Sequence, residues 1–540
     1  MEKEYLKQRL QIAGFGTLLL WSIGIFNVIH NEQIEPVFGN AVSVDKEMET
    51  GKGGDVVKIE MEQSKQDYME MLYLKMLEEQ TDDTEILTYI GEAPSIRVLL
   101  RDSDFSKRYH ENVKITSDGQ FSVQFTYKGQ NTEVFYGPGE IVDMSKYDTW
   151  FNEGSVTVDG YGGKLKILSL EREYGTPVYE GMLEISQKKD KYYIVNELSL
   201  EDYLRYVVPS EMPSGYPLEA LKAQAVCART YAYGFIQEPG LAEYDANLDD
   251  SVSFQVYNNI TAQESTDAAI EATRGHLLSY GEELAEAFFY STSCGFGTDI
   301  SVWNANKEKY PYLQAKNHGE QKLIGIEALS QGQSVHIPTG SEMQKEEVFV
   351  KYINDVCKED FEADLPWYRW TYEVKKIDVK ELEKRLKEKY ESKPSLVLTL
   401  SANGQYESKG VGKIEKIKEI WVSSRRPGGA ACGLCIQTQD TIYQVLTENA
   451  IRSILCDGST KVVNGDGKKV SFKSLLPSAF FAISTSKEGE NVIGYNVIGG
   501  GYGHGIGMSQ NGASQMAKSG YSAVQILQHF FEGTQIKQVY

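Results

Sequence analysis

The sequence is poor in positive charge, and this shortage excludes one class of function. Its 540 residues hold 55 lysines and arginines against 77 aspartates and glutamates, which gives a formal net charge of −22. Such a surface repels the phosphates of nucleic acid, so we predict no nucleic-acid partner. Recognition of a neutral polymer through a shaped, hydrogen-bonding groove fits this charge better. The alternative interpretation of the negative net charge is simply a solvated acidic surface.

Cysteine is also scarce, with six in the chain. Cys432 and Cys435 have the spacing of half a zinc ribbon, but no second pair follows, and Cys456 is isolated. If residues 432–435 form a strand, the odd spacing puts the two sulfurs on opposite faces. We therefore predict no metal and no cofactor. A disulfide between Cys432 and Cys435 stays open as a minor alternative outside the cell.

The glycine-rich segment near the C-terminus lacks both nucleotide-binding patterns. Gly503, Gly505 and Gly507 do not have the spacing of the dinucleotide fingerprint, and no Gly-Lys-Ser/Thr follows. Glycine lets a backbone approach a ligand closely and adopt positive φ. His504 lies within this segment, and Ser509 is placed to cap a helix that reaches about Lys518. A lone histidine is usually structural. His504 becomes a candidate site residue because of the glycine-rich loop around it and the family resemblance given below.

The apolar run at residues 10–29 is long enough to cross a bilayer, and it carries no charge. Lys3, Lys7 and Arg9 precede it, and the next basic residue is Lys46, so the positive-inside rule places the N-terminus in the cytoplasm. We expect a single-pass cell-membrane protein whose C-terminal region is extracytoplasmic. A cleaved signal peptide is the alternative, although no clear small-residue cleavage site closes the run.

The rest of the chain has the composition of an ordinary globular protein with two or three domains. Residues 31–94 are predicted to form an acidic linker with a short helix at about 68–77. Short apolar runs separated by turn residues predict a β-rich lobe at 95–200. We predict an α+β class, a two-lobed mixed α/β region at 95–540, and a cleft between the lobes. After the β-rich lobe, this region is predicted to contain residues 201–319 with the block around Glu211, residues 320–364 as an insertion, and residues 365–540 as a C-terminal lobe with the glycine and histidine loop.

The most informative segment places one glutamate, Glu211, between Pro209 and Pro213. The two prolines predict a stiff loop around Glu211, followed by a helix at 218–236 rich in alanine. Apolar neighbours such as Val208 and Met212 would raise the pKa of the carboxyl and make it a proton donor near neutral pH. The competing interpretation is a solvated turn residue.

This segment closely resembles the SpoIID/LytB family, and further blocks agree in order over about residues 95–540. The blocks are Val208-Pro209-Ser210-Glu211-Met212-Pro213, Glu219 to Ala232, Phe254-Gln255-Val256-Tyr257, Ala272-Thr273-Arg274-Gly275, Phe289 to Gly295 with Trp303, and Gly501 to Ala513. The resemblance implies a stage II sporulation protein D-like lytic transglycosylase, which cleaves peptidoglycan glycan strands during engulfment of the forespore.

The mechanism that the resemblance implies uses one carboxyl twice. Glu211 protonates the oxygen between N-acetylmuramic acid and N-acetylglucosamine, and then takes the proton of the muramic C6 hydroxyl as the 1,6-anhydro ring closes. No obvious second carboxylate motif accompanies Glu211, which is consistent with this chemistry. The candidate substrate-binding residues are Arg229, Tyr231, Ser291, Thr292, His504 and Gln510.

Two further expectations follow from the resemblance. Some family members hold zinc through a histidine and cysteines, but here Tyr290 stands at the histidine position and Cys294 is a single cysteine. A SpoIIP-like amidase is an expected partner, beside peptidoglycan itself. The alternative function is a non-catalytic wall-binding enhancer of a partner amidase, as LytB-type relatives are described, and a purely structural anchored protein is a third interpretation.

Overall fold

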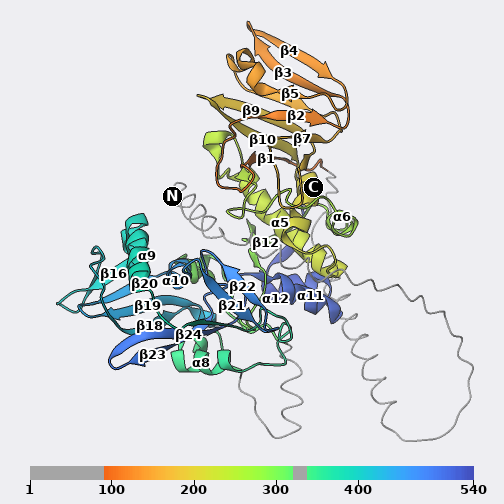
Figure 1. Cartoon of the computed structure of the whole chain (residues 1–540). Coiled ribbons are helices and arrows are strands. Elements are labelled where there is room, and N and C mark those ends of the chain that lie inside the picture. Colours follow the sequence, from red (N-terminus) through yellow and green to blue (C-terminus); the bar gives the residue numbers. More distant parts are fainter. Residues whose placement is uncertain (1–90, 320–336) are drawn as a thin grey trace, which may run out of the picture. The chain divides into compact units, whose positions relative to one another are not determined.

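The computed structural model describes residues 91–319 and 337–540. The expected membrane segment at 10–29 and the expected short helix at 68–77 lie outside these residues. Among the helices that are described, none has the length and apolar character needed to cross a membrane. Glu92 to Tyr540 belong to one compact unit, and Figure 1 labels many of its elements. The mixed α/β class expected from the sequence is confirmed.

The N-terminal part of this unit is a β-rich region with two sheets (Figure 1). The seven-stranded sheet has the order β11-β1-β10-β9-β6-β3-β4, and the four-stranded sheet has the order β5-β2-β7-β8. The pairing is antiparallel except between β1 and β11. The strands are β1 (Ser95–Leu100), β2 (Lys114–Ser117), β3 (Phe121–Tyr127), β4 (Gln130–Tyr136), β5 (Val142–Asp143), β6 (Val156–Asp159), β7 (Leu165–Ile167), β8 (Val178–Tyr179), β9 (Met182–Lys188), β10 (Lys191–Ser199) and β11 (Leu248–Asp249).

The central and C-terminal helices carry the blocks singled out in the sequence. The α-helices are α4 (Leu200–Glu211), α5 (Leu218–Gln237), α6 (Glu264–Glu271), α8 (Glu346–Asn354), α9 (Val379–Ser392), α10 (Glu448–Leu455), α11 (Gln510–Lys518) and α12 (Ala523–Phe530). Short 3₁₀ turns occur at Met144–Lys146, Asp148–Phe151, Ala242–Tyr244, Ile300–Trp303, Lys307–Lys309, Glu342–Gln344, Pro394–Leu396 and Pro427–Gly429. The predicted alanine-rich helix at 218–236 is therefore confirmed as α5, and the predicted cap at Ser509 starts α11.

Four more sheets complete the described fold. Their orders are β13-β12-β26, β14-β25, β22-β21-β15-β24-β23 and β17-β16-β20-β19-β18. The strands are β12 (His276–Tyr280), β13 (Glu283–Leu284), β14 (Phe289–Tyr290), β15 (Trp370–Val374), β16 (Val397–Leu400), β17 (Tyr406–Glu407), β18 (Ile417–Arg425), β19 (Ala431–Thr438), β20 (Ile442–Leu446), β21 (Thr460–Asn464), β22 (Lys469–Phe472), β23 (Phe481–Glu488), β24 (Asn491–Gly499), β25 (Met508–Ser509) and β26 (Gln535–Gln538).

Helix α5 contributes to two hydrophobic cores. Ala225 and Ala228 belong to a core shared with the seven-stranded sheet and α4. Ala220 and Cys227 belong to a second core shared with α11 and α12, which pack on α5 (Figure 1). Because alanine has a small side chain and a high helix propensity, α5 lets these neighbours approach closely without losing its own stability. The end of α4 and the start of α11 are thereby anchored to the same helix.

The segment predicted as an insertion at 320–364 contributes to the second core where it is described. Met343, Phe349 and Ile353 are buried there, and the helix α8 that carries two of them packs against β18 and β23. The residues from 337 onward are thus part of the core packing, because their apolar side chains fill it together with those of α5 and α12.

Candidate active site

Glu211 lies at the last position of α4, and the expectation of a loop around it was wrong. Pro209 lies inside the helix, two residues before its end, where the lost hydrogen bond affects only the final turn. Ser210 fixes this turn, because its hydroxyl donates to the Tyr206 carbonyl at 2.6 Å and accepts from the Ile260 amide at 3.1 Å. The chain becomes extended at Met212, so helix geometry holds Glu211 in place.

The carboxyl of Glu211 is half-buried and receives one main-chain hydrogen bond. The amide of Val256 donates to its Oε1 at 2.6 Å. Burial raises the pKa of Glu211 to about 7, although the Val256 hydrogen bond favours the charged form and opposes the rise. Near neutral pH the carboxyl therefore exists in both its protonated and its charged form. Val256 comes from the Phe254 to Tyr257 block, so two distant sequence blocks build this one group.

Gln510 fixes the backbone of Glu211 from the C-terminal loop. Its side-chain Nε2 donates to the main-chain carbonyl of Glu211 at 2.9 Å. Gln510 is the first residue of α11, and the N-cap residue Ser509 accepts the Gly512 amide through its hydroxyl. The structure thus brings together the two blocks that carry the candidate acid and the glycine-rich loop.

A chain of polar side chains continues from this contact. The hydroxyl of Tyr216 donates to Asn511 Oδ1 at 2.5 Å, and Asn511 Nδ2 donates to Thr292 Oγ1 at 2.9 Å. Thr292 Oγ1 lies 3.1 Å from Ser291 Oγ. Tyr216 and Ser291 are half-buried, whereas Thr292 is buried. Of the two predicted sugar-binding hydroxyls, Ser291 is therefore the one whose side chain is partly open to solvent.

Both ring nitrogens of His504 make hydrogen bonds to the main chain, one to β14 and one within the glycine-rich loop. Its Nε2 lies 3.0 Å from the Phe289 carbonyl, and its Nδ1 accepts the Ile506 amide at 3.1 Å, which places the proton on Nε2. Burial lowers the pKa of His504 to about 3, so the ring is neutral at physiological pH. Tyr290 and Trp303 pack against the ring with centroid distances of 5.5 and 5.0 Å. These contacts make His504 an organiser of the loop beside the site.

Arg229 lies in the interior, which argues against its predicted contact with sugar. Its side chain is fully buried and makes a two-pronged ion pair with Glu201, with both N–O distances at 2.8 Å. The guanidinium also donates to the Ile270 carbonyl and to the Thr273 hydroxyl. Tyr231, two residues after Arg229 on α5, is half-buried and packs edge-on against Phe235.

Sequence reasoning missed one titratable group of this region, Glu362. Its side chain is 1% exposed, and its Oε1 accepts the Ser509 hydroxyl at 2.7 Å and the Ser293 amide at 2.8 Å. Burial raises the pKa of Glu362 to about 8. Glu362 lies in the segment that matched no family block, and no sequence motif surrounds it, so no local signal pointed to it.

The cysteines of the described residues are all free. Cys432 is half-buried and Cys435 is buried on the same strand β19, in agreement with the expected opposite faces. Across residues 91–319 and 337–540, no cluster of three or more His, Cys, Asp and Glu side chains is placed to hold a metal ion. Tyr290, at the position expected for a zinc-binding histidine, is buried.

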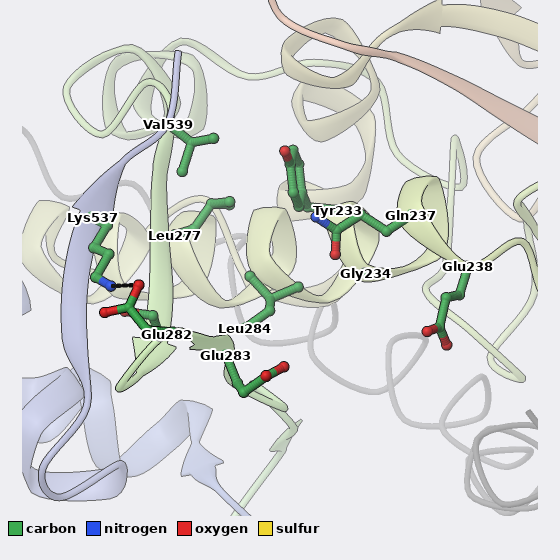
Figure 2. A pocket seen from close by; sticks show the side chains of 11 residues that line it. Tyr233, Gly234, Gln237, Glu238, Leu277, Glu282, Glu283, Leu284, Lys537 and Val539 are labelled. Carbon is green, nitrogen blue, oxygen red and sulfur yellow. Dashed lines mark ion pairs between the residues drawn. The ribbon is translucent and has the colours of Figure 1, made fainter. Parts of the chain in front are cut away.

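A cavity of about 410 Å³ lies between the C-terminal half of α5, the β12–β13 hairpin and β26 (Figure 2). Figure 2 shows Lys537 paired with Glu282 at one side, and the distance between their charged groups is 3.9 Å. Tyr233, Leu277 and Leu284 supply apolar surface. None of the predicted site residues lines this cavity, so it is separate from the environment of Glu211.

The fold and the site define a mixed α/β protein that holds a half-buried carboxyl of raised pKa at the end of a helix. Residues 188–280, which include Glu211, match the family model SpoIID, described as Stage II sporulation protein. Residues 299–507 match a domain of unknown function (DUF8618). Together with the relatives below, these matches confirm the resemblance of residues 188–280, the segment that carries Glu211, to the SpoIID family.

Relatives carry two different names. The chain is 26% identical over 335 residues to a protein named Amidase enhancer of Bacillus subtilis, covering 61% of this chain and 40% of that protein. It is 26% identical over 361 residues to Stage II sporulation protein D of Bacillus subtilis, covering 64% and 76%. An uncharacterized protein of Brachyspira hyodysenteriae is 38% identical over 137 residues, covering 25% and 36%. The chain thus spans well under half the length of the first and third of these proteins.

Proposed function

We propose that this protein is a membrane-anchored lytic transglycosylase that cleaves the glycan backbone of peptidoglycan in sporulation. The substrate bond joins N-acetylmuramic acid to N-acetylglucosamine, and the product ends in 1,6-anhydro-N-acetylmuramic acid. The match of residues 188–280 to the SpoIID family model and the similarity to Stage II sporulation protein D support the link to sporulation. The anchor is the apolar run at 10–29, and the extracytoplasmic location follows from it.

The observation that carries the proposal is the raised pKa of the Glu211 carboxyl. A general acid works best when its pKa lies near the working pH, and burial raises this pKa to about 7. Glu211 is half-buried as a residue, Gln510 holds its main-chain carbonyl, and the Val256 amide holds one carboxyl oxygen. Such a fixed, partly protonated carboxyl is what one-residue acid and base catalysis requires.

In the proposed reaction, Glu211 donates one proton and afterwards takes up another. Glu211 gives its proton to the glycosidic oxygen, the C1–O bond breaks, and the N-acetylglucosamine end leaves as an alcohol. The C6 hydroxyl of the muramic ring then bonds to C1 and loses its proton to the Glu211 carboxylate. Because the nucleophile is part of the substrate, water is not consumed. The Val256 amide stabilises the carboxylate between the two steps.

The proposed sugar contacts come from half-buried groups around Glu211. Ser291 and Tyr231 are half-buried, and Tyr216 is connected to Ser291 by hydrogen bonds through Asn511 and Thr292. Gln510 and His504 shape the loop that faces the glycan, and Arg229 holds the scaffold behind it. The substrate would be bound by hydrogen bonds and ring faces, in keeping with a neutral polymer.

The test incubates the purified chain with glycan strands, both with and without stem peptides, and analyses the products by mass spectrometry. The proposal expects anhydro-muropeptides or anhydro-saccharides, and their loss in Glu211→Gln. A preference for peptide-free strands would indicate that a SpoIIP-like amidase acts first. Intact glycan in every reaction with the wild-type chain would refute the proposal.

The second candidate function is stimulation of a partner amidase without glycan cleavage. The relative named Amidase enhancer, which matches 61% of this chain, favours it. Adding an N-acetylmuramoyl-L-alanine amidase to the same incubation separates the two functions. Faster release of stem peptides with unchanged glycan supports the enhancer, and equal rates with Glu211→Gln would show that its carboxyl is not needed for it.

A further inference from the structure

Glu362 joins the two segments that meet beside Glu211. One of its oxygens, Oε1, accepts the Ser293 amide from the segment after β14 and the Ser509 hydroxyl from the start of α11. The other oxygen, Oε2, is buried and has no hydrogen-bond partner. A Cβ added at Gly512 would lie 3.0 Å from Oε2, so the glycine leaves room for the carboxyl against the first turn of α11.

From Glu362, a short series of contacts leads to Glu211. The Ser509 hydroxyl that donates to Glu362 also accepts the Gly512 amide and thereby caps α11. The next residue, Gln510, donates to the main-chain carbonyl of Glu211 at 2.9 Å. Moving Ser509 would therefore rotate the first residue of α11, whose amide holds Glu211.

The contacts of Glu362 differ from those of the neighbouring buried carboxyl, Asp360. Asp360 accepts the hydroxyls of Tyr352 and Tyr368 at 2.6 Å each and the Asn317 amide at 2.9 Å. Both of its oxygens are satisfied, and it contacts neither Ser509 nor Ser293 through these bonds. A buried carboxyl with an unpartnered oxygen costs stability. The unpartnered oxygen of Glu362 therefore points to a role beyond packing.

We propose that Glu362 is a positioning residue for the candidate acid: through Ser509 and Gln510 it fixes the main chain of Glu211 in the orientation that proton transfer needs. The inference deepens the proposed function and rests on it for its kinetic part. Misplacing a catalytic group by about 1 Å can cost 10²-fold in rate. Glu362 itself does not touch the substrate.

The kinetic test compares Glu362→Ala, Glu362→Gln and Gln510→Ala in cleavage of glycan strands. We expect Glu362→Ala to lower kcat by about 10- to 100-fold and to change KM by less than about threefold. Glu362→Gln keeps the acceptor oxygen, so its kcat should stay within about threefold of wild type. Since both residues act on one contact, Glu362→Ala and Gln510→Ala combined should lose about as much as the larger single loss.

Asp360→Asn is the matched control, because it is a buried carboxyl two residues away with other partners. It should lower stability and leave kcat within about threefold. The proposal is overturned if Glu362→Ala keeps its kcat, if Glu362→Gln loses as much as Glu362→Ala, or if the double variant multiplies the two losses.

Amide hydrogen exchange tests the inference independently of catalysis. The Ser293 and Gly512 amides are bonded to Glu362 and Ser509, respectively, so they should exchange at least about tenfold faster in Glu362→Ala than in wild type and in Glu362→Gln. Asp360→Asn should leave both protected well below its melting temperature. If the wild-type chain does not cleave glycan, the proposed function fails, while this exchange pattern still decides whether Glu362 positions the two segments. Unchanged exchange in Glu362→Ala would overturn the positioning role.

Discussion

Glu211 and Glu362 are two carboxyls in neighbouring environments, and burial raises the pKa of both, to about 7 and about 8. They differ in access. Glu211 is half-buried at the end of α4 with one main-chain donor, whereas Glu362 is 1% exposed and is held by two donors. A raised pKa therefore marks burial in both cases, and the difference in exposure is the reason why we assign the proposed proton transfer to Glu211 and the proposed positioning role to Glu362.

The largest expected effect comes from Glu211→Gln, which removes the acidic proton and keeps the shape of the side chain. We expect glycan cleavage to fall by about 10³-fold or more, because both proton transfers are lost. Product mass spectrometry measures the loss, and Glu271→Gln, an equal charge change at an exposed position of α6, serves as the control. Residual activity above about one tenth of wild type in Glu211→Gln would assign the acid to another residue.

Arg229→Ala extends the comparison to a buried cation. The change leaves the Glu201 carboxylate unpaired in the interior, which typically costs about 3–5 kcal/mol of unfolding free energy. Thermal or denaturant unfolding measures this cost. Arg229→Lys keeps the charge but loses the two-pronged geometry, so it should fall between Arg229→Ala and wild type. A stable Arg229→Ala with a raised KM would instead support the sugar contact predicted from the sequence.

The pH dependence of kcat/KM distinguishes a Glu211 acid from other groups. The acid must be protonated, so kcat/KM should be highest below the pKa of about 7 and fall about tenfold per pH unit above it. His504 is neutral across this range, because its pKa is lowered to about 3, and it adds no limb between pH 5 and 9. A profile that stays flat to pH 9 would contradict the assignment.

The smallest expected effect is a change with pH in the stability that Glu362 contributes, and it distinguishes Glu362 from Glu211. The folded pKa of Glu362, about 8, is raised above its unfolded value, so its favourable contribution is complete below the unfolded pKa and is lost as pH rises through about 8. Glu362→Gln cannot ionise. Its melting temperature relative to wild type should therefore be higher at pH 8.5 than at pH 5, on the order of 5 °C. An equal difference at both pH values would mean that Glu362 is ionised in the folded protein at pH 5.

Local sequence signals predicted the elements around Glu211, and they failed where contacts are distant in the chain. The alanine-rich pattern predicted α5, and the cap signal at Ser509 predicted α11, because both depend on neighbouring residues. Prolines suggested a loop at Glu211, but tertiary packing of α4 tolerates Pro209 within its last turn. The lobes, the cleft between them and the membrane anchor stay predictions.

In the candidate site, too, local motifs were predictable from the sequence and contacts between distant residues were not. Glu211 was recognised because a short motif surrounds it, and Gln510 because it follows the glycine-rich loop. The donor to Glu211, Val256, lies 45 residues away in a matched block, but it donates through its main-chain amide, a contact that the identity of its side chain does not predict. Glu362 lies 147 residues from its partner Ser509 in a segment without a motif. Arg229 shows the reverse error, since an arginine in a matched block is in fact bound to Glu201 in the interior.

The most direct test of the central proposal is cleavage of glycan strands in water enriched in heavy oxygen. If Glu211 donates a proton to the leaving oxygen and takes the proton of the C6 hydroxyl as the ring closes, the new muramic ends are anhydro sugars and carry no label. Heavy oxygen incorporated at reducing muramic ends in a Glu211-dependent manner would show that water attacks C1, and would contradict intramolecular closure.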